Sequence, residues 1–289
     1  MGIILSEKPK VIVQGITGNT GRFHTALMLQ YGTNIVAGVT PGRGGEEVEG
    51  IPVFNTVSEA SGKFNSDTSI MFVPANTAKD AVFEAISAGI KILVIITEGI
   101  PQKDAIQFIN KANDIGDIII IGPNSPGLIA PPHKINIGIM PDHIFNRGNV
   151  GIVFRSGTLT YEIAWHITNK GLGQSTCVGI GGDAIVGLDY IKILKMFKAD
   201  EETKKVVLLG EIGGNAEELV AQYISETNYP KPVVAYIAGR SAPSGKRMGH
   251  AGAIIMGNTG TAESKINAFT AAGVPEAEKP SDVVKLLEI

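Results

Sequence analysis

Residues 10–21 read K-V-I-V-Q-G-I-T-G-N-T-G, and this stretch decides the fold of the first half of the chain. Residues 10–14 form a short apolar run of strand length. Gly15, Gly18 and Gly21 follow at regular spacing and open a helical stretch. Glycines let a ligand approach the backbone, and the free amides and dipole of a helix N-terminus attract an anion. The stretch therefore predicts a strand, a phosphate-binding turn and a helix.

The same alternation continues through the first half of the chain. Further apolar runs predict buried strands at residues 34–39, 69–73, 92–96 and 118–121, and helical periodicity marks residues 21–31, 77–88 and 103–115. Continuous apolar strands separated by helices are typical of a parallel sheet that is covered on both faces. We therefore expect a doubly wound α/β domain over residues 1–123.

A proline-rich stretch separates this domain from a second one. Residues 122–148 contain five prolines and show no long periodic element, so residues 124–148 are predicted to be a connector outside both sheets. Strands are then expected at residues 149–154, 175–179, 205–209 and 233–237. A chain of 289 residues is long enough for a second doubly wound domain, which we expect over residues 149–289.

Composition excludes several classes of function. With 25 Lys and Arg against 28 Asp and Glu, the net charge of -3 predicts no broad nucleic-acid-binding surface. No apolar run approaches the roughly 18 residues that span a membrane. The single cysteine, Cys177, suits a reducing compartment, so we expect a cytoplasmic protein, or a mitochondrial matrix protein only if a transit peptide has been removed. Four of the five histidines, His24, His133, His143 and His166, show no metal-ligand spacing, and no metal site is predicted.

The loops after the second and fourth strands indicate which ligand the first domain binds. A nicotinamide enzyme should carry an acidic residue at the end of the second strand, but residues 37–45 read A-G-V-T-P-G-R-G-G, with Arg43 and no acid before Glu46. Arginine suits an adenosine that carries an additional phosphate, as in coenzyme A or NADP. The glycine turn also has one residue more than the dinucleotide-binding motif. Ile96, Thr97 and Glu98 end the fourth strand at the same edge of the sheet.

A second glycine-rich loop exposes one histidine. Residues 245–252 read G-K-R-M-G-H-A-G, with His250 between small residues and close to the cations Lys246 and Arg247. A neutral imidazole can form a covalent intermediate, and the neighbouring cations favour an anion. We interpret His250 as a residue that is phosphorylated. The alternative is a structural histidine in a flexible connector.

Two further segments of the second domain are expected near this histidine. Ser156, Gly157 and Thr158 stand where a strand gives way to a helix, a position whose hydroxyls and amides bind phosphate, although helix capping would explain them equally well. Glu211 ends a strand in L-G-E-I-G-G and is expected to hold one imidazole nitrogen, leaving the other as the nucleophile. The chain contains no P-loop, because residues 239–247 have the wrong spacing and end in arginine.

With these motifs in place, the chain resembles the α subunits of the succinyl-CoA synthetase family, the nucleoside-diphosphate-forming acyl-CoA ligases, over essentially its full length. The resemblance is carried, in order, by G-I-T-G-N-T-G, V-T-P-G-R-G-G, I-T-E-G-I-P, G-P-N-S-P-G, R-S-G-T-L-T-Y-E, G-E-I-G-G and G-K-R-M-G-H-A-G-A. It implies a Rossmann-like CoA-binding domain followed by a flavodoxin-like ligase domain. The residues that it implies at the site are Thr17, Gly18, Asn19, Thr20, Arg43, Ile96, Thr97 and Glu98 for CoA, Tyr161 for the substrate and His250 for phosphate.

The same resemblance implies a partner and a reaction cycle. A β subunit with an ATP-grasp domain would bind ADP or ATP, or GDP or GTP, together with magnesium, in a heterodimer or heterotetramer. Phosphate would convert succinyl-CoA into succinyl phosphate and CoA, and His250 would pass the phosphoryl group to the nucleotide.

Related chains usually have lysine in place of Arg43 and often cysteine in place of Ser125.

Three alternatives remain open at the level of sequence. The glycine turn and Arg43 also fit an NADP-dependent oxidoreductase. A CoA-binding regulator without catalytic activity would need His250 only as a structural residue. Within the family, acetate, citrate or malate could replace succinate, because the sequence does not reveal what binds the distal carboxylate.

Overall fold

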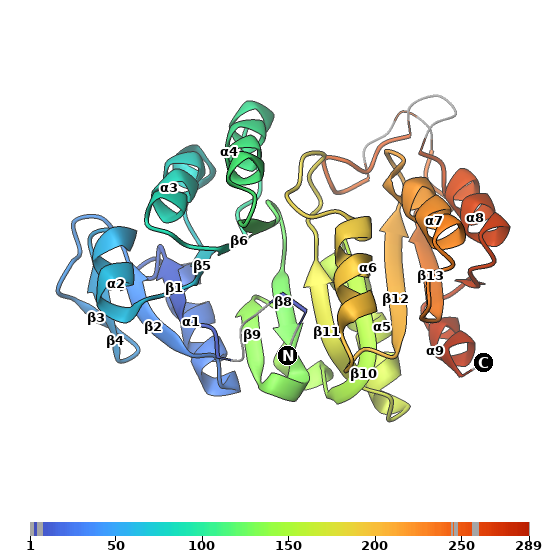
Figure 1. Ribbon diagram of the computed structural model, residues 1–289, viewed down its shortest axis with the longest axis horizontal. Coiled ribbons are helices and arrows are strands. Elements are labelled where there is room, and N and C mark those ends of the chain that lie inside the picture. Colours follow the sequence, from blue (N-terminus) through green and yellow to red (C-terminus); the bar gives the residue numbers. More distant parts are fainter. Residues whose placement is uncertain (1–2, 5–7, 244, 246–247, 256–259, 289) are drawn as a thin grey trace.

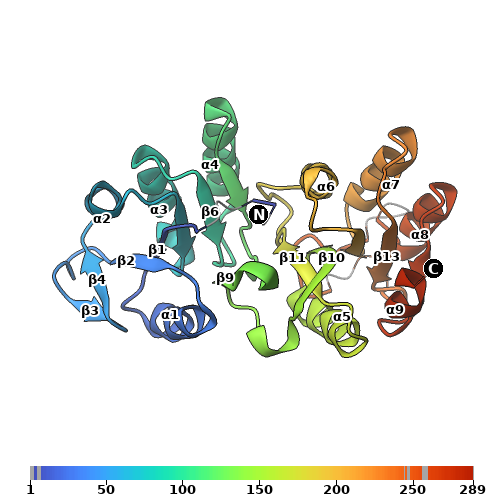
Figure 2. The ribbon, with the colours of Figure 1, turned by 60° about the horizontal axis from the view of Figure 1, so that its bottom comes forward.

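The computed structural model describes residues 3–4, 8–243, 245, 248–255 and 260–288. Two seven-stranded sheets lie side by side along the long axis of the molecule, and β8 and β9 form the edge of the second sheet that faces the first (Figure 1). Helices cover both faces of the sheets (Figure 2). Within the described residues, no helix is long and apolar enough to cross a membrane.

The first sheet has the strand order β3-β4-β2-β1-β5-β6-β7. Its strands are β1 (Val11–Gln14), β2 (Ile35–Val39), β3 (Glu47–Val48), β4 (Ile51–Phe54), β5 (Thr68–Met71), β6 (Ile92–Ile95) and β7 (Ile119–Ile121). All neighbours pair in parallel except β3 and β4, which form an antiparallel hairpin. Without β3, the order is that of a dinucleotide-binding fold, and its direction reverses between β1 and β5. The predicted doubly wound first domain is confirmed.

Four helices connect these strands. They are α1 (Asn19–Tyr31), α2 (Val57–Phe64), α3 (Ala75–Ser87) and α4 (Gln102–Ile115). Helix α1 lies on one face of the sheet, and α2 and α4 lie on the other (Figure 2). The sequence prediction missed α2 and the β3–β4 hairpin. Helix α2 begins at a side-chain cap, because the Thr56 hydroxyl accepts a hydrogen bond from the Glu59 amide.

The second sheet has the strand order β14-β13-β12-β10-β11-β8-β9. Its parallel strands are β10 (Arg147–Phe154), β11 (Gln174–Gly179), β12 (Lys205–Glu211), β13 (Val233–Ala238) and β14 (Glu276–Ala277). Its helices are α5 (Gly157–Asn169), α6 (Tyr190–Ala199), α7 (Ala216–Glu226), α8 (Ala262–Ala271) and α9 (Asp282–Leu287). Counted from β10, this is the 2-1-3-4-5 order of flavodoxin-like folds, as predicted.

Residues 124–148 are not the connector that the sequence predicted. They contain β8 (Gly127–Ala130) and β9 (Ile135–Gly138), which pair with each other and extend the second sheet from β11, all in antiparallel orientation. The short 3-10 helix η1 (Pro131–His133) contains two of the prolines, and η2 (Asp142–Ile144) begins directly after a third, Pro141. The prolines therefore occupy turns, where their missing amide costs no ladder hydrogen bond, and the strands between them are free to pair.

Strand β9 also joins the two domains. The Thr33 hydroxyl, just after α1, donates to the Asn136 carbonyl at 2.8 Å and accepts from the Asn136 amide at 3.0 Å. Both residues are buried. One apolar cluster runs from Val13 in β1 through Ile137 to Leu208 in β12, so the two domains share a continuous core.

Candidate functional site

A cavity of about 720 Å³ lies at the carboxyl end of the first sheet. Its lining comes from the loops after β1, β2 and β5 and from the start of α3, at the point where the strand order reverses. Open α/β sheets bind ligands at this position. Thr17 and Gly18 line it, as the sequence predicted, and the Thr17 hydroxyl lies 3.1 Å from that of Thr40 across the opening.

The glycine turn brings the backbone close to this cavity. A side chain at Gly21 would place Cβ 2.2 Å from the Gly15 carbonyl oxygen, so the first turn of α1 requires glycine at this position. Gly18 precedes the helix without a side-chain cap, which leaves the first amides of α1 available to a ligand. Asn19 and Thr20 are the first residues of α1 and are exposed.

Arg43 belongs to the loop after β2 but does not line this cavity. Its side chain is exposed and forms a two-armed ion pair with Glu46, in which Nη2 lies 2.8 Å from Oε2. Arg43 lowers the pKa of the Glu46 carboxyl, mainly through this hydrogen bond. The guanidinium that the sequence assigned to a phosphate is thus held by a carboxylate of its own loop.

The predicted loop at 96–98 lies between two sites. The Thr97 hydroxyl donates to the Val73 carbonyl at 2.6 Å, which ties the loop after β6 to the loop after β5. Glu98 lines a different cavity, of about 530 Å³, together with Asp183 from the second domain and Gly249 from the histidine loop. Glu98 therefore faces the boundary between the domains, whereas Thr17 faces the first cavity.

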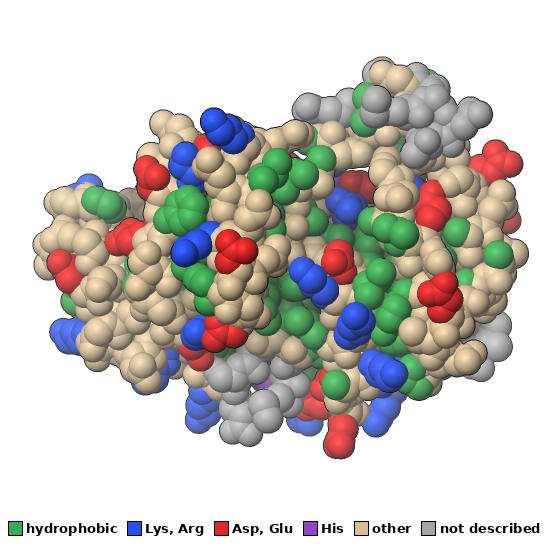
Figure 3. All heavy atoms as spheres, turned by 45° about the horizontal axis from the view of Figure 1, so that its top comes forward, with side chains coloured by type: hydrophobic (Ala, Val, Ile, Leu, Met, Phe, Trp, Pro, Cys, Tyr) green, Lys and Arg blue, Asp and Glu red, His purple; other side chains and the backbone are tan. Residues whose placement is uncertain are grey.

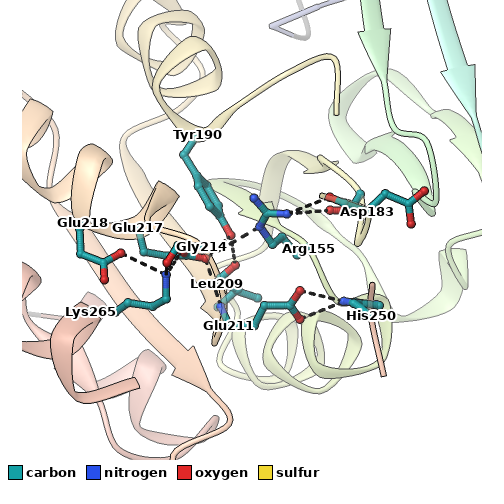
Figure 4. A network of polar contacts seen from close by, with 11 residues as sticks. Arg155, Asp183, Tyr190, Leu209, Glu211, Gly214, Glu217, Glu218, His250 and Lys265 are labelled. Carbon is teal, nitrogen blue, oxygen red and sulfur yellow. Dashed lines mark hydrogen bonds and ion pairs between the residues drawn. The ribbon is translucent and has the colours of Figure 1, made fainter. Parts of the chain in front are cut away.

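His250 and Glu211 form a close pair at the carboxyl end of the second sheet. The imidazole Nδ1 lies 2.9 Å from both carboxylate oxygens of Glu211, the last residue of β12 (Figure 4). This hydrogen bond raises the pKa of His250, against the opposing effects of burial and of Arg155. A carboxylate on Nδ1 holds the proton there and leaves Nε2 free, which is the arrangement of an oriented nucleophile.

A glycine from the neighbouring strand end allows the imidazole to lie where it does. A Cβ atom on Gly182, after β11, would lie 2.5 Å from Cγ of His250 and 2.6 Å from its Cδ2. Real side-chain carbons do not approach so closely. The histidine loop is further attached by a hydrogen bond from the Gly252 amide to the Gly182 carbonyl.

The N-terminus of α5 opens into the same space. Ser156, Glu211 and His250 line one cavity of about 390 Å³. Ser156 precedes α5, but its side chain does not cap the helix. Its hydroxyl and the first amides of the helix therefore remain available. Helix capping, the alternative explanation for Ser156, is not observed. Gly157 is the first helical residue, and Thr158 after it is exposed.

Tyr161 lies one turn into α5 and is largely enclosed. Its ring packs edge-on against Phe145, and its hydroxyl lies close to Gly157 at the helix start. Burial raises the pKa of Tyr161 to about 12, so the phenol stays protonated and can donate a hydrogen bond.

Sequence reasoning missed a set of charged residues behind Glu211. Arg155 approaches the carbonyls of Gly181 and Asp183, at 3.4 Å from each oxygen. Glu217 and Lys265 form a buried ion pair (Figure 4). Lys265 was detectable, because it falls on the buried face of α8 at the spacing of Ala262 and Phe269.

Ser125, where related chains often have cysteine, has a structural role. It is 3% exposed. Its hydroxyl donates to the Gly179 carbonyl at 2.6 Å and accepts from the Gly127 amide at 2.9 Å. The turn into β8 therefore depends on this hydroxyl. Cys177, in β11, is buried and packs in the core.

Some residues named in the sequence predictions lie outside the part of the chain that the structure describes. Lys246 and Arg247, the cations next to the histidine loop, lie outside them. Among the residues that are described, no group of three or more potential ligands is arranged to hold a metal ion. Basic and acidic side chains are interspersed on the face seen in Figure 3.

Comparisons with known proteins identify both domains of the chain. Residues 6–99 match the family described as CoA binding domain, and residues 153–275 match the family described as CoA-ligase. The chain is 57% identical over 287 residues to succinate–CoA ligase [ADP-forming] subunit alpha 2 of Archaeoglobus fulgidus, covering 99% of each. It is 52% identical to the alpha subunit of the same enzyme from Aquifex aeolicus, covering 100% of this chain and 96% of the relative.

A solved structure shows the same two-domain arrangement. ATP citrate lyase from Methanothrix soehngenii, in complex with citrate and coenzyme A, matches with a TM-score of 0.88 at 25% identity. The match covers 98% of this chain, which spans about half of that longer protein.

Fold and matched domains together define a CoA-ligase subunit with a CoA-binding domain at its N-terminus. The chain belongs to the family of succinate–CoA ligase α subunits.

Proposed function

We propose that this chain is the α subunit of a ligase that interconverts succinyl-CoA, phosphate and ADP with succinate, CoA and ATP. In this cycle, phosphate attacks the thioester carbonyl and releases CoA as the thiol, leaving succinyl phosphate. Nε2 of His250 then attacks phosphorus, the bond to the acyl oxygen breaks, and succinate leaves. The phosphoryl group passes from Nε2 to the nucleotide. We propose ADP because the relatives are named as ADP-forming.

The observation that carries this proposal is the orientation of His250. Glu211 contacts Nδ1 with both oxygens at 2.9 Å, and the imidazole shares a cavity with Ser156 at the start of α5. A phosphoryl group on Nε2 would meet the uncapped amides and the positive end of that helix. Phosphoryl transfer depends on such positioning and charge stabilisation.

The first domain fits coenzyme A as the substrate that it holds. Thr17, Gly18, Asn19 and Thr20 would bind phosphate through the start of α1, and the cavity of about 720 Å³ beside them offers apolar walls for the rest of the nucleotide. Arg43 would bind the 3′-phosphate after leaving Glu46. Ile96, Thr97 and Glu98 would guide the thiol end toward the second domain, where we assign Tyr161 to the acyl group.

A partner chain follows from what this chain lacks. Its sequence has no P-loop. We therefore propose a β subunit with an ATP-grasp domain, which would bind the nucleotide and magnesium and complete the second half of the phosphoryl-transfer site. The buried single cysteine, Cys177, suits a cytoplasmic enzyme.

The test is the chemistry of one residue. Incubated with ATP and its β subunit, the chain should gain one phosphoryl group that is acid-labile and alkali-stable, and peptide mapping should locate it on His250. His250→Asn should abolish both the modification and succinyl-CoA synthesis while CoA still binds. A phosphoserine, or full activity of the variant, would contradict the mechanism. Turnover by the chain without a β subunit would contradict the assigned division of labour.

A further inference from the structure

A buried ion pair lies behind Glu211, outside the cavities described above. The Lys265 ammonium contacts the Glu217 carboxylate, and their side chains are 0% and 1% exposed. Lys265 also donates to the Gly214 carbonyl at 3.2 Å and lies 3.1 Å from Glu218. A buried ion pair adds little to stability compared with apolar residues of similar size. Its presence so close to the site calls for another role.

Glu217 connects this pair to the end of β12. Its Oε1 accepts a hydrogen bond from the backbone amide of Glu211 at 3.2 Å. The Tyr190 hydroxyl, which donates to the Leu209 carbonyl at 2.8 Å, lies 3.4 Å from the same oxygen. Figure 4 shows the chain of contacts from Lys265 through Glu217 to the strand end that carries the Glu211 side chain toward His250.

This backbone contact falls at the end of β12, where pairing with β10 has stopped at Leu209 and pairing with β13 stops at Glu211. Glu211 is the last residue of the strand, and a glycine-rich turn at residues 212–214 follows it before α7 begins. Glycine turns leave the backbone many conformations. In the conformation present here, both Glu211 oxygens reach Nδ1 of the imidazole while the Glu211 amide donates to the Glu217 carboxylate.

We infer that Glu217, with its charge neutralised by Lys265, is a positioning residue that fixes the end of β12 and thereby aligns Glu211 on His250. This inference rests on the proposed function, because it assigns to the ion pair the orientation of the phosphoryl-accepting imidazole. Glu217 itself does not contact the reacting atoms.

Two double variants separate this hydrogen bond from the buried charges. Glu217→Gln with Lys265→Met removes both charges but keeps an acceptor for the Glu211 amide. Glu217→Met with Lys265→Met removes the same charges and the acceptor as well. Neutral replacements of similar volume are tolerated in such positions. Glu218→Gln is the matched control, because Glu218 contacts Lys265 and Ser264 rather than β12.

The measurement uses the full-length chain and phosphoramidate, a phosphoryl donor that needs no nucleotide site. Phosphorylation of His250 is followed by intact mass and peptide mapping, and its tautomer by NMR of histidines labelled with 15N. CoA binding checks that each variant is folded. We expect the methionine double variant to react about tenfold more slowly than the glutamine one, the usual effect of losing a residue that orients a reactive side chain. Its Nδ1–H tautomer should also be less populated.

The outcomes distinguish the two proposals. Equal rates and equal tautomer populations in the two double variants would overturn the inference about Glu217. A defect in Glu218→Gln as large as that of the methionine double variant would also overturn it, because loss of local charge would then be sufficient. If phosphate in the wild-type chain maps to a residue other than His250, the proposed function fails, while the tautomer comparison still tests the positioning role.

Discussion

Replacing Gly182 by alanine should displace the imidazole of His250 without changing the chemical identity of any residue that reacts. The added Cβ would lie 2.5 Å from Cγ of His250 and 2.9 Å from Nδ1. Non-bonded carbon atoms settle at about 3.5–4.0 Å, so the imidazole and its loop must move by about 1 Å. Gly182 does not have the positive φ that would strain alanine, so the backbone itself tolerates the change.

A shift of this size should be costly for phosphoryl transfer. The hydrogen bonds from Nδ1 to Glu211 are 2.9 Å long, and a displacement of about 1 Å breaks them or misdirects Nε2. Misplacement on this scale lowers rates by about 100-fold in enzymes that depend on positioning. We expect that loss in the rate of His250 phosphorylation by ATP in the αβ complex. CoA affinity should stay unchanged, because its cavity lies in the first domain.

Gly252→Ala provides the control within the same loop. A Cβ there would lie 3.6 Å from the Gly182 carbonyl oxygen and 3.7 Å from Ala184, which is ordinary contact, so this variant should be phosphorylated at nearly the wild-type rate. If Gly182→Ala reacts as fast as Gly252→Ala, the imidazole can relax without loss, and the argument that its position limits the reaction is wrong.

Three further predictions concern other groups. His250 must be neutral to attack, so the rate of its phosphorylation should rise as the pH passes its raised pKa. Glu211→Gln should move the midpoint of this pH profile to lower pH and reduce the maximum rate. An unmoved midpoint would contradict Glu211 as the cause of the raised pKa. Arg43→Ala should lower the affinity for CoA about tenfold but change the affinity for dephospho-CoA little. Glu46→Gln should raise the affinity for CoA, and calorimetry measures both effects. Ser125→Ala should lower the unfolding free energy by about 1–3 kcal/mol in urea, and Ser125→Cys by less; equal losses would show that hydrogen bonding is not the cause.

The sign of the pH effect on stability follows from the same pair. The pKa of His250 is raised in the folded chain by its hydrogen bond to Glu211. The contribution of this hydrogen bond to the free energy of unfolding is therefore fully present below the pKa of the unfolded-state histidine. It is lost as the pH rises through the pKa of His250 in the folded chain. Phosphorylation and stability should respond to pH in opposite directions across this window.

The buried parallel strands were predictable because each is apolar on both faces. The predicted strand at residues 92–96 matches β6, and that at 205–209 lies within β12. Edge elements were not predictable in the same way. The hairpin at 47–54 contains charges and a proline, which edge strands tolerate. Strands β8 and β9 were hidden by prolines that occupy the turns around them.

The candidate site was predictable only as far as local motifs reach. His250 and Ser156 each stand in a glycine-rich sequence at a strand or helix end, and the structure brings them into one cavity. Glu217 has no such signature, because a first-turn acid is ordinary on its own. Lys265 is distinguished only by its place on the apolar face of α8, which does not reveal its partner. They meet only because α7 and α8 pack together, which depends on tertiary structure.

The charges of the described residues around His250 bear on how a phosphoryl group would be stabilised there. Lys265 pairs with Glu217 and Glu218, and the Arg155 guanidinium lies 3.9 Å from Glu217 and also interacts electrostatically with Glu211, so these two cations are already shared among carboxylates. A phosphoryl group on Nε2 would bring further negative charge beside a carboxylate. The N-terminus of α5 offers only about half a unit charge. Transfer to a nucleotide requires the developing charge to be stabilised from both sides, so we propose that, beyond these described residues, a partner chain supplies further positive charge or a helix dipole.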